Sequence, residues 1–474
     1  MIGLLNAFGK LLALTPRPLL RLVCWIFGPL IGWVRPQRKR QAIASLALAF
    51  PEWSARKIHR IYRENARRLI EMGLLVVALP HFSERQLRRM IFLDETTKAL
   101  IKKHFGADRQ QAPTVLMIPH LTLSELLTAM PAVVDFPLCP TKVIFRPIPS
   151  LKLNRWVHES RSRHGVQLLS RKKGFGDAMR ALANAETVGI LFDQKAGGSG
   201  SLITFFDRIC LASELPGILA EKYQAAVYAS ALERTEFWQA QLRLFPLQCA
   251  ANAAEVTFAG HEWLQQYLSG NEERAADWLW LHDRWGSFYK PAKRFMLAHK
   301  RELFKEQNQR LGRATLPRKE PVWCLLPESA KAAAAYLPVI QAIRDARPDF
   351  SLTLAAAEDY IFEWMQQGLA EKCLLLPKQP LASWRVFWSH RHHYSATVLV
   401  FDPSASAALG AWLLRCPQRF GIGSSWFRRV ALTVNVGNPA AEEATQAWLN
   451  GLQAYGLRTE KTMHKRTKLP KNKK

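Results

Sequence analysis

Residues 114–125 have the sequence TVLMIPHLTLSE. The fold predicted for the chain is organised around this stretch. Within it, VLMI at residues 115–118 is a short, continuous apolar run, which is typical of a strand covered on both faces of a sheet. Pro119 has no N–H to donate to a neighbouring strand, so the strand ends there. The stretch therefore predicts a buried strand, a sharp turn that carries His120, and a helix that begins near Thr122.

His120 and Glu125 are five positions apart. Within one helix, five positions correspond to about 500° of rotation, which leaves the two side chains roughly 140° apart. They can meet only if His120 lies in the turn and Glu125 reaches back from the first turn of the helix. The carboxylate would then hold one imidazole nitrogen while the other takes a proton from a hydroxyl. A second interpretation stays open, because Thr122 to Glu125 also fits a capping box, in which Glu125 only caps the helix.

A second His–Glu pair with the same spacing, His59 and Glu64, serves as an internal control. It lies in residues 54–77, where apolar residues recur at helical intervals and Ser54 is the expected N-cap. There the two side chains point to different faces of one helix, which predicts a solvated surface. The strand before His120 distinguishes the two pairs.

Composition limits the kinds of partner. The 474 residues are enough for two or three domains, and the formal net charge is +28. So basic a chain implies an anionic partner, which could be nucleic acid, acidic lipid headgroups or an acidic carrier protein. No familiar nucleic-acid signature is present, so no specific nucleic-acid partner is expected. The seven cysteines are scattered and form no CxxC, which predicts a reducing compartment and neither a disulfide framework nor a metal site.

Residues 1–40 are apolar and basic, which predicts a membrane anchor. Their longest uncharged stretch, residues 22–34, has about 13 residues, fewer than the roughly 20 of a simple transmembrane helix. An interfacial or re-entrant anchor is therefore favoured, with the basic cluster at residues 35–40 against anionic headgroups. A buried pair of helices is the alternative. The basic cluster also predicts that the residues after it are cytoplasmic.

Beyond His120, strands and helices alternate, which predicts an α/β domain with a largely parallel sheet. The expected elements are strands at residues 142–145 and 188–192 and a basic helix at residues 154–164. Arg146 and the pair Asp193-Gln194 each follow a strand, so they can share one sheet edge with His120. The glycine-rich loop at residues 195–201 lacks a Walker lysine, and we do not expect it to bind a nucleotide. The aromatic-rich residues 278–290 are more typical of packing than of a site.

The C-terminal part of the chain predicts a second α/β unit. Residues 301–320 are polar and basic and are expected to be a linker. Within residues 321–457, the expected elements are strands at 322–326, 351–355, 373–376 and 397–401 and a helix at 330–346. Residues 458–474 are lysine-rich and expected to be disordered.

Several short motifs occur in an order that resembles one family. They are ASLALAFPE at 44–52, the pair His120 and Glu125, FRP at 145–147, RSRHG at 161–165, FDQ at 192–194 with Gly197 and Gly198, FF at 205–206 and WLHDRW at 280–285. With these motifs, residues 1 to about 300 resemble the lipid A late acyltransferases, the lauroyl and myristoyl transferases of Gram-negative inner membranes. The resemblance implies membrane-anchor residues 1–40 and an acyltransferase-like domain at 41–300. It also implies a fold related to the glycerol-phosphate acyltransferases.

The resemblance also implies a reaction. An acyl chain would pass from acyl carrier protein to a hydroxyl of lipid A or its precursor, at the cytoplasmic face of the bacterial inner membrane. His120 would be the general base and Glu125 its orienting partner. The substrates would be positioned by Arg146, by Arg161 or Arg163, and by Asp193 and Gln194. Because a thioester is already activated, a base and an oxyanion site are sufficient, and no metal or cofactor is expected.

Residues 321–457 look like the N-terminal half of an ADP-heptose heptosyltransferase-type glycosyltransferase. The motifs behind this second resemblance are LPVIQAIR at 337–344, residues 398–402 and RFGIG at 419–423. The usual Gly-Asp at the first helix is replaced by Lys331-Ala332, and the donor-binding half is missing. The expectation is a non-catalytic module that helps to bind the lipopolysaccharide acceptor.

Other functions stay open beside lipid A acylation. The acceptor could be another glycolipid or a phospholipid. The protein could also be a catalytically inactive membrane scaffold that binds glycolipid. Replacing His120 by alanine separates a catalyst from a scaffold, because a scaffold would keep its function.

Overall fold

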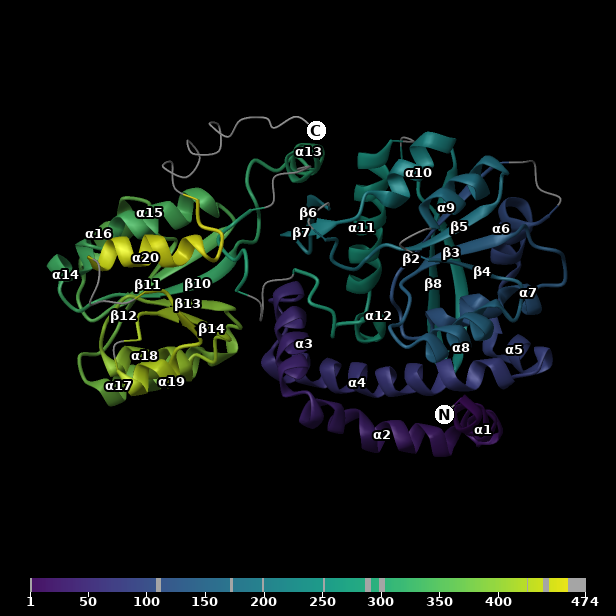
Figure 1. Cartoon of the computed structure of the whole chain (residues 1–474), viewed down its shortest axis with the longest axis horizontal. Coiled ribbons are helices and arrows are strands. Elements are labelled where there is room, and N and C mark those ends of the chain that lie inside the picture. Colours follow the sequence, from purple (N-terminus) through teal and green to yellow (C-terminus); the bar gives the residue numbers. More distant parts are fainter. Residues whose placement is uncertain are drawn as a thin grey trace. The chain divides into compact units, whose positions relative to one another are not determined.

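The computed structural model divides into two compact units, Met1–Phe206 with Leu211–Arg284, and Asp207–Cys210 with Trp285–Lys474 (Figure 1). The residues that it describes are 2–107, 112–170, 174–197, 200–249, 252–285, 291–297, 303–423, 425–437 and 443–458. Apart from Arg458, the tail predicted to be disordered lies outside the described residues, as do Gly198 and residues 286–290.

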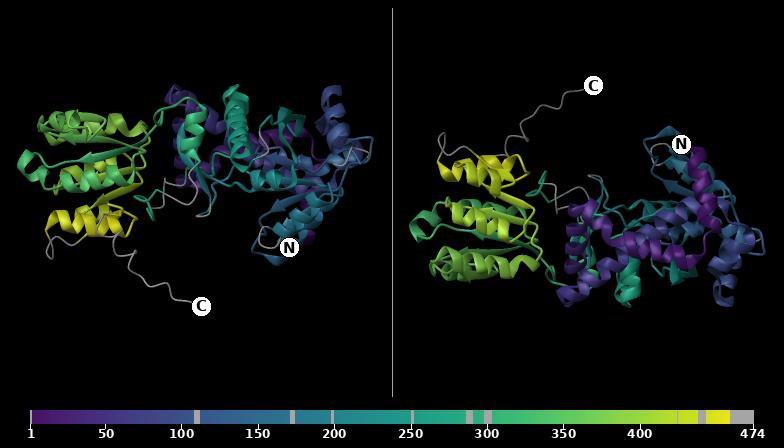
Figure 2. Two further views of the ribbon diagram at one scale, coloured as in Figure 1. Left: turned by 90° about the horizontal axis from the view of Figure 1, so that it is seen from above. Right: turned by 90° about the horizontal axis from the view of Figure 1, so that it is seen from below.

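Four helices begin the first unit. They are α1 (Ile2–Leu14), α2 (Arg17–Val34), α3 (Pro36–Ala49) and α4 (Ala55–Ala78). As predicted, Ser54 caps α4 by accepting a hydrogen bond from the backbone of Lys57. Helix α2 packs along α4 (Figures 1 and 2), and its buried residues Leu20, Cys24, Gly28 and Gly32 recur every four positions. A side chain at Gly28 would meet Arg67, since a Cβ there would lie 2.7 Å from Arg67 Cγ. The glycines therefore allow close contact between the two helices.

A seven-stranded sheet lies at the centre of the first unit, with the order β1-β9-β8-β2-β5-β3-β4. Its strands are β1 (Ile91–Phe92), β2 (Thr114–Ile118), β3 (Thr141–Phe145), β4 (Gln167–Ser170), β5 (Thr187–Leu191), β8 (Ala226–Glu236) and β9 (Gln239–Pro246). Neighbouring strands are parallel except β8 and β9. All residues of β2 are buried, which confirms the predicted strand and the predicted parallel α/β sheet.

The sheet is accompanied by further helices, of which α8 corresponds to the helix predicted at residues 154–164 and starts three residues earlier. They are η1 (Leu79–His81), α5 (Glu84–Met90), α6 (Glu95–Phe105), η2 (Ser124–Ala129), α7 (Met130–Val133), α8 (Leu151–Ser162), α9 (Gly174–Ala183), α10 (Leu215–Tyr223), α11 (Ala253–Ser269) and α12 (Glu272–Asp277). A hairpin of β6 (Ser201–Phe205) and β7 (Arg208–Ala212) follows β5 along the chain. The helix expected near Thr122 is the 3₁₀ helix η2, and its N-cap Leu123 makes no side-chain cap. The capping-box interpretation of Glu125 is therefore wrong.

The second unit contains a six-stranded parallel sheet with the order β12-β11-β10-β13-β14-β15. Its strands are β10 (Glu320–Leu325), β11 (Phe350–Ala356), β12 (Lys372–Leu375), β13 (Thr397–Val400), β14 (Gln418–Gly421) and β15 (Val434–Asn435). Its helices are α13 (Phe304–Arg310), α14 (Ala330–Ala334), α15 (Leu337–Ala346), α16 (Tyr360–Gln366), α17 (Pro380–Ser389), η3 (His390–His392), α18 (Ala405–Leu413), α19 (Trp426–Ala431) and α20 (Ala444–Gln453). Helices cover both faces of the sheet (Figure 1).

Two details of this unit differ from the predictions. The single helix expected at residues 330–346 is two helices, α14 and α15. Pro338 lies in the first turn of α15, where its missing N–H costs no helical hydrogen bond, so a new helix starts there. The predicted linker at residues 301–320 contains the helix α13.

Candidate active site

His120 and Asp193 lie side by side because of the register of two neighbouring strands. In the parallel pair β2 and β5, Ile118 is opposite Leu191, so the residues two positions beyond each strand end come together. His120 Nδ1 lies 2.5 Å from Asp193 Oδ1. The backbone N–H of His120 donates to the other carboxylate oxygen of Asp193 at 2.8 Å. One carboxylate therefore holds both the ring and the backbone of the histidine.

Asp193 is buried and ionised. Burial by itself would raise the pKa of this carboxyl. The electrostatic interaction with the His120 ring, together with hydrogen bonds from His120 and from Trp278 Nε1 at 2.6 Å, instead lowers the pKa of Asp193 well below its ordinary value. An ionised carboxylate accepts the Nδ1 proton, which leaves the lone pair of the imidazole on Nε2.

Nε2 of His120 is the nitrogen that is free for chemistry. It lies 2.9 Å from the side-chain Nε2 of Gln194, whose amide N–H can donate to it in this tautomer. The side chain of His120 is 23% exposed, whereas Asp193 is shielded behind it. The arrangement is that of an oriented general base with its basic atom accessible.

Glu125 is not the orienting partner of His120 that the sequence predicts. Its two carboxylate oxygens accept hydrogen bonds from Arg161 Nε at 2.6 Å and Arg161 Nη2 at 2.8 Å, a bidentate pair. The start of η2 at Ser124 places Glu125 in its first turn, where it contacts the guanidinium from α8. Of the described residues, Asp193 is the carboxylate that holds Nδ1.

A cavity of about 660 Å³ joins most of the predicted residues. Its charged and amide-bearing lining residues are His120, Glu125, Arg146, Arg161, Gln194 and Lys195. Most other lining residues are apolar, and they include Met72, Phe105, Ile118, Val143 and Leu242. Arg163, the alternative to Arg161, is the C-cap of α8 and does not line the cavity. The cavity is suited to a long apolar group that carries a polar reacting end.

The segment that begins at Trp278, directly after α12, belongs to the site. From the sequence, residues 278–290 were predicted to be a packing segment. Leu279 N–H donates to the carbonyl oxygen of His120 at 3.1 Å, and Thr122 N–H donates to that of Asp277 at 3.0 Å. With the Trp278 bond to Asp193, this segment fixes both members of the His–Asp pair. Nothing in the spacing of the sequence indicated that Trp278 would contact Asp193, which lies 85 positions earlier in the chain.

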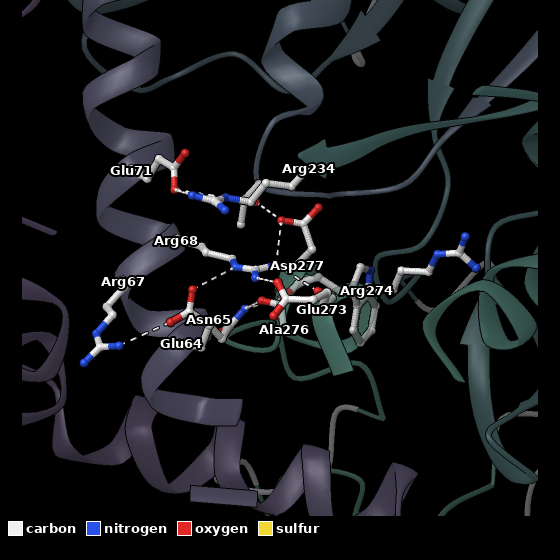
Figure 3. Close-up of polar contacts among 12 residues, drawn as sticks. Glu64, Asn65, Arg67, Arg68, Glu71, Arg234, Glu273, Arg274, Ala276 and Asp277 are labelled. Atoms are coloured by element: carbon white, nitrogen blue, oxygen red, sulfur yellow. Dashed lines mark hydrogen bonds and ion pairs between the residues drawn. The ribbon is translucent and has the colours of Figure 1, made fainter. Parts of the chain in front are cut away.

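Helix α4 contacts both α12 and the residue that follows it, Trp278 (Figure 3). Asn65 donates to the carbonyl oxygens of Ala276 and Trp278, at 2.8 and 2.7 Å. The buried guanidinium of Arg68 lies 3.6 Å from Asp277, and it also pairs with Glu273 and bonds its backbone carbonyl. Burial raises the pKa of Asp277 to about 6, although Arg68 and the Thr122 hydroxyl oppose the shift.

Two other features bear on chemistry. His282 Nε2 accepts a hydrogen bond from the Lys195 backbone at 2.7 Å, and burial, with the nearby Arg284 charge, lowers the pKa of His282 to about 4. His282 is therefore neutral and holds the loop after Gln194. Within the described part of the chain, no three His, Cys, Asp or Glu side chains gather in a way that could hold a metal ion.

Comparisons with known proteins point to one family. The family model of the bacterial lipid A biosynthesis acyltransferases matches residues 1–287. No curated protein matches the chain. Among solved structures, the glycosyl transferase family 9 protein from Veillonella parvula DSM 2008 shares 15% identity, with a TM-score of 0.25. That match covers 30% of this chain and 42% of the other, and so weak a likeness supports no conclusion about the second unit.

The heptosyltransferase resemblance of residues 321–457 therefore stays a prediction. The family match, in contrast, covers 287 of the 474 residues, which is more than half of the chain. It spans the strands, the His–Asp pair and the segment that supports them. This protein belongs to the bacterial lipid A biosynthesis acyltransferase family.

Proposed function

We propose that the first unit transfers an acyl chain from the thioester of acyl carrier protein to a hydroxyl of lipid A or its precursor. One observation carries the proposal: Asp193 holds Nδ1 of His120, and the His120 side chain lines a largely apolar cavity. The net charge of +28 suits both an acidic carrier protein and a phosphorylated glycolipid.

The proposed reaction needs one base and no covalent enzyme intermediate. His120 Nε2 takes the proton of the acceptor hydroxyl while the hydroxyl oxygen attacks the thioester carbonyl. The tetrahedral intermediate then collapses, the C–S bond breaks, and the imidazolium returns its proton to the departing thiolate. Asp193 stabilises the imidazolium between these two steps. The products are an ester and a free thiol.

Other cavity residues have supporting roles in this proposal. The amide of Gln194, 2.9 Å from His120 Nε2, releases Nε2 when the hydroxyl arrives and then donates to the oxyanion. The pair of Glu125 and Arg161 shapes the polar part of the cavity, and Arg146 adds a positive charge for the substrates. The apolar lining takes the acyl chain, at about 0.8 kcal/mol for each CH₂ that it removes from water.

We further propose that α1 and α2 lie in the membrane interface. By length and composition, α2 is apolar enough to cross a membrane, which is weak evidence for a span. However, α2 packs along α4, where Arg67 contacts Gly28 and its guanidinium lies 5.7 Å from the Trp25 ring centroid. A span would draw this arginine into hydrocarbon. The outward residues are apolar and include Leu14, Trp33 and Val34, each more than three-quarters exposed.

The test is mass spectrometry of lipid A from cells that lack this protein and carry either the wild type or His120→Ala. We expect one secondary acyl chain to disappear on deletion, to return with the wild type and to stay absent with His120→Ala. His59→Ala is the matched control, because His59 has the same spacing to a glutamate but lies within α4. It should restore the chain.

Full restoration by His120→Ala would overturn the mechanism. If lipid A keeps its mass in every strain, the acceptor is another lipid or the protein is a scaffold. Acylation of other extracted lipids by the purified protein then distinguishes these two.

A further inference from the structure

Helices α17, α18 and α19 cover one face of the sheet in the second unit (Figure 1). This face exposes many large apolar side chains. The three helices pack side by side, and Phe387 and Ala411 point inward to the core against the sheet. The outward residues are Leu381, Trp388, Trp412, Trp426, Phe427 and Val430, which we call the tryptophan face. Trp426 is 77% exposed and Trp412 is 54% exposed. This layer of helices is therefore apolar on both its sides.

The helices on the other face of the same sheet differ. Among the described residues of α15, α16 and α20, Phe362 is the one large apolar side chain that is exposed. The acidic residues Asp345 and Glu363 lie on these helices. A cluster of exposed aromatic rings is thus a property of one face, and a surface of this kind marks an interaction site.

The tryptophan face is also basic. Residues 380–436 contain six arginines and a single acidic residue, Asp402. Arg419 donates to two backbone carbonyls inside the unit and Arg428 to three, so their role is structural, whereas Arg391 and Arg429 donate to one each. The other four are Arg385, Arg391, Arg415 and Arg429. None of these four has a carboxylate partner among the residues that the structure describes.

Two of these four guanidiniums lie against an exposed ring, and that of Arg391 also donates to the backbone carbonyl of Trp388 at 2.6 Å. Arg391 is 4.3 Å and Arg415 is 5.0 Å from the centroid of Trp388. Arg415 follows α18, whereas Trp388 is on α17, so the contact joins the two helices. At Trp388, positive charge from two arginines therefore lies directly against an apolar ring of the tryptophan face.

We propose that the tryptophan face binds the surface of an anionic lipid bilayer. Tryptophan and arginine both have apolar bodies and polar ends, and both are stable where headgroups meet acyl chains. The four arginines without a carboxylate partner complement anionic headgroups. The rings are spread over three helices of one layer, which favours a broad lipid surface over the binding of an acidic protein. The tryptophan face contains none of the catalytic residues, so its binding to lipid does not depend on the proposed reaction.

The test is hydroxyl-radical footprinting of the full chain with excess nanodiscs, read by mass spectrometry at single tryptophans. One set of nanodiscs contains only zwitterionic lipid and the other contains about 30% anionic lipid. We expect oxidation of Trp412 and Trp426 to fall several-fold on the anionic set, while oxidation of Phe362 stays the same. The triple variant Arg385→Glu, Arg415→Glu and Arg429→Glu should lose this protection.

Lys331→Glu, an exposed charge reversal on α14, is the matched control and should keep the protection. Melting temperatures show whether each variant is folded. Equal oxidation of the two tryptophans on both sets would overturn the proposal. Two other results would also overturn it, because the partner would then be a protein. One is protection on zwitterionic nanodiscs that appears only when acidic carrier protein is added. The other is protection that appears only when the concentration of this chain rises.

Discussion

At the scale of single residues, the charge of Asp193 determines which nitrogen of His120 is basic. Asparagine keeps the shape but can donate to Nδ1, which moves the imidazole proton to Nε2 and removes the base. We therefore expect Asp193→Asn to lower kcat by about 10³- to 10⁴-fold. The measurement is single-turnover acyl transfer by purified protein, and an effect below tenfold would contradict the role.

The double variant of His120→Ala with Asp193→Asn checks that the two residues act as a unit. It should be no slower than His120→Ala alone, because Asp193 acts only through the imidazole that His120→Ala has already removed. Multiplicative losses would mean that Asp193 acts elsewhere.

The sequence predicted these residues better than it predicted their contacts. His120, Asp193 and Gln194 could be found because each follows an apolar run that is readable as a strand. Which carboxylate holds the imidazole could not be found. That contact depends on β2 and β5 being neighbours in register, and spacing along the chain contains no such information.

At the scale of elements, α4 supports the active site through a buried charge pair. Asp277 has a folded-state pKa of about 6, above its ordinary value of 3.8. The contribution of Asp277 to the free energy of unfolding is therefore fully present below pH 3.8 and is lost as the pH rises through 6. Arg68 limits this loss, because it lies 3.6 Å from the carboxylate that becomes charged.

Removing Arg68 should therefore be most harmful at neutral pH. We expect Arg68→Met to lower the free energy of unfolding by about 3–5 kcal/mol at pH 7.5, because Asp277 is left charged and buried. At pH 5 Asp277 is protonated, and the loss should be smaller. Urea unfolding at the two pH values measures this difference. Adding Asp277→Asn to Arg68→Met should recover part of the lost free energy of unfolding at pH 7.5. If Arg68→Met loses the same free energy at both pH values, the pair of Arg68 and Asp277 is not the cause.

Strands were the elements that the sequence predicted best. Continuous apolar runs located β2, β3, β5 and β10 to within about two residues. In a strand that is buried on both faces, such as β2, burial leaves little choice of side chain. Helix ends were less certain, as the break between α14 and α15 shows. The support from α4 could not be predicted, because Asn65 bonds backbone atoms more than two hundred positions away, and any sequence supplies those atoms.

At the scale of the whole molecule, the net charge of +28 predicts how the donor arrives. Salt shortens the Debye length from about 10 Å at 0.1 M to about 3 Å at 1 M, so long-range attraction to an acidic carrier protein weakens. We expect kcat/KM for an acyl carrier protein donor to fall at least tenfold between these concentrations, mainly through slower association. A neutral acyl-pantetheine thioester reports the chemical step without that attraction, and its rate should change little. Initial rates with both donors measure the difference. If the two donors lose activity in parallel, salt acts on the enzyme or the acceptor, and the basic surface has another partner.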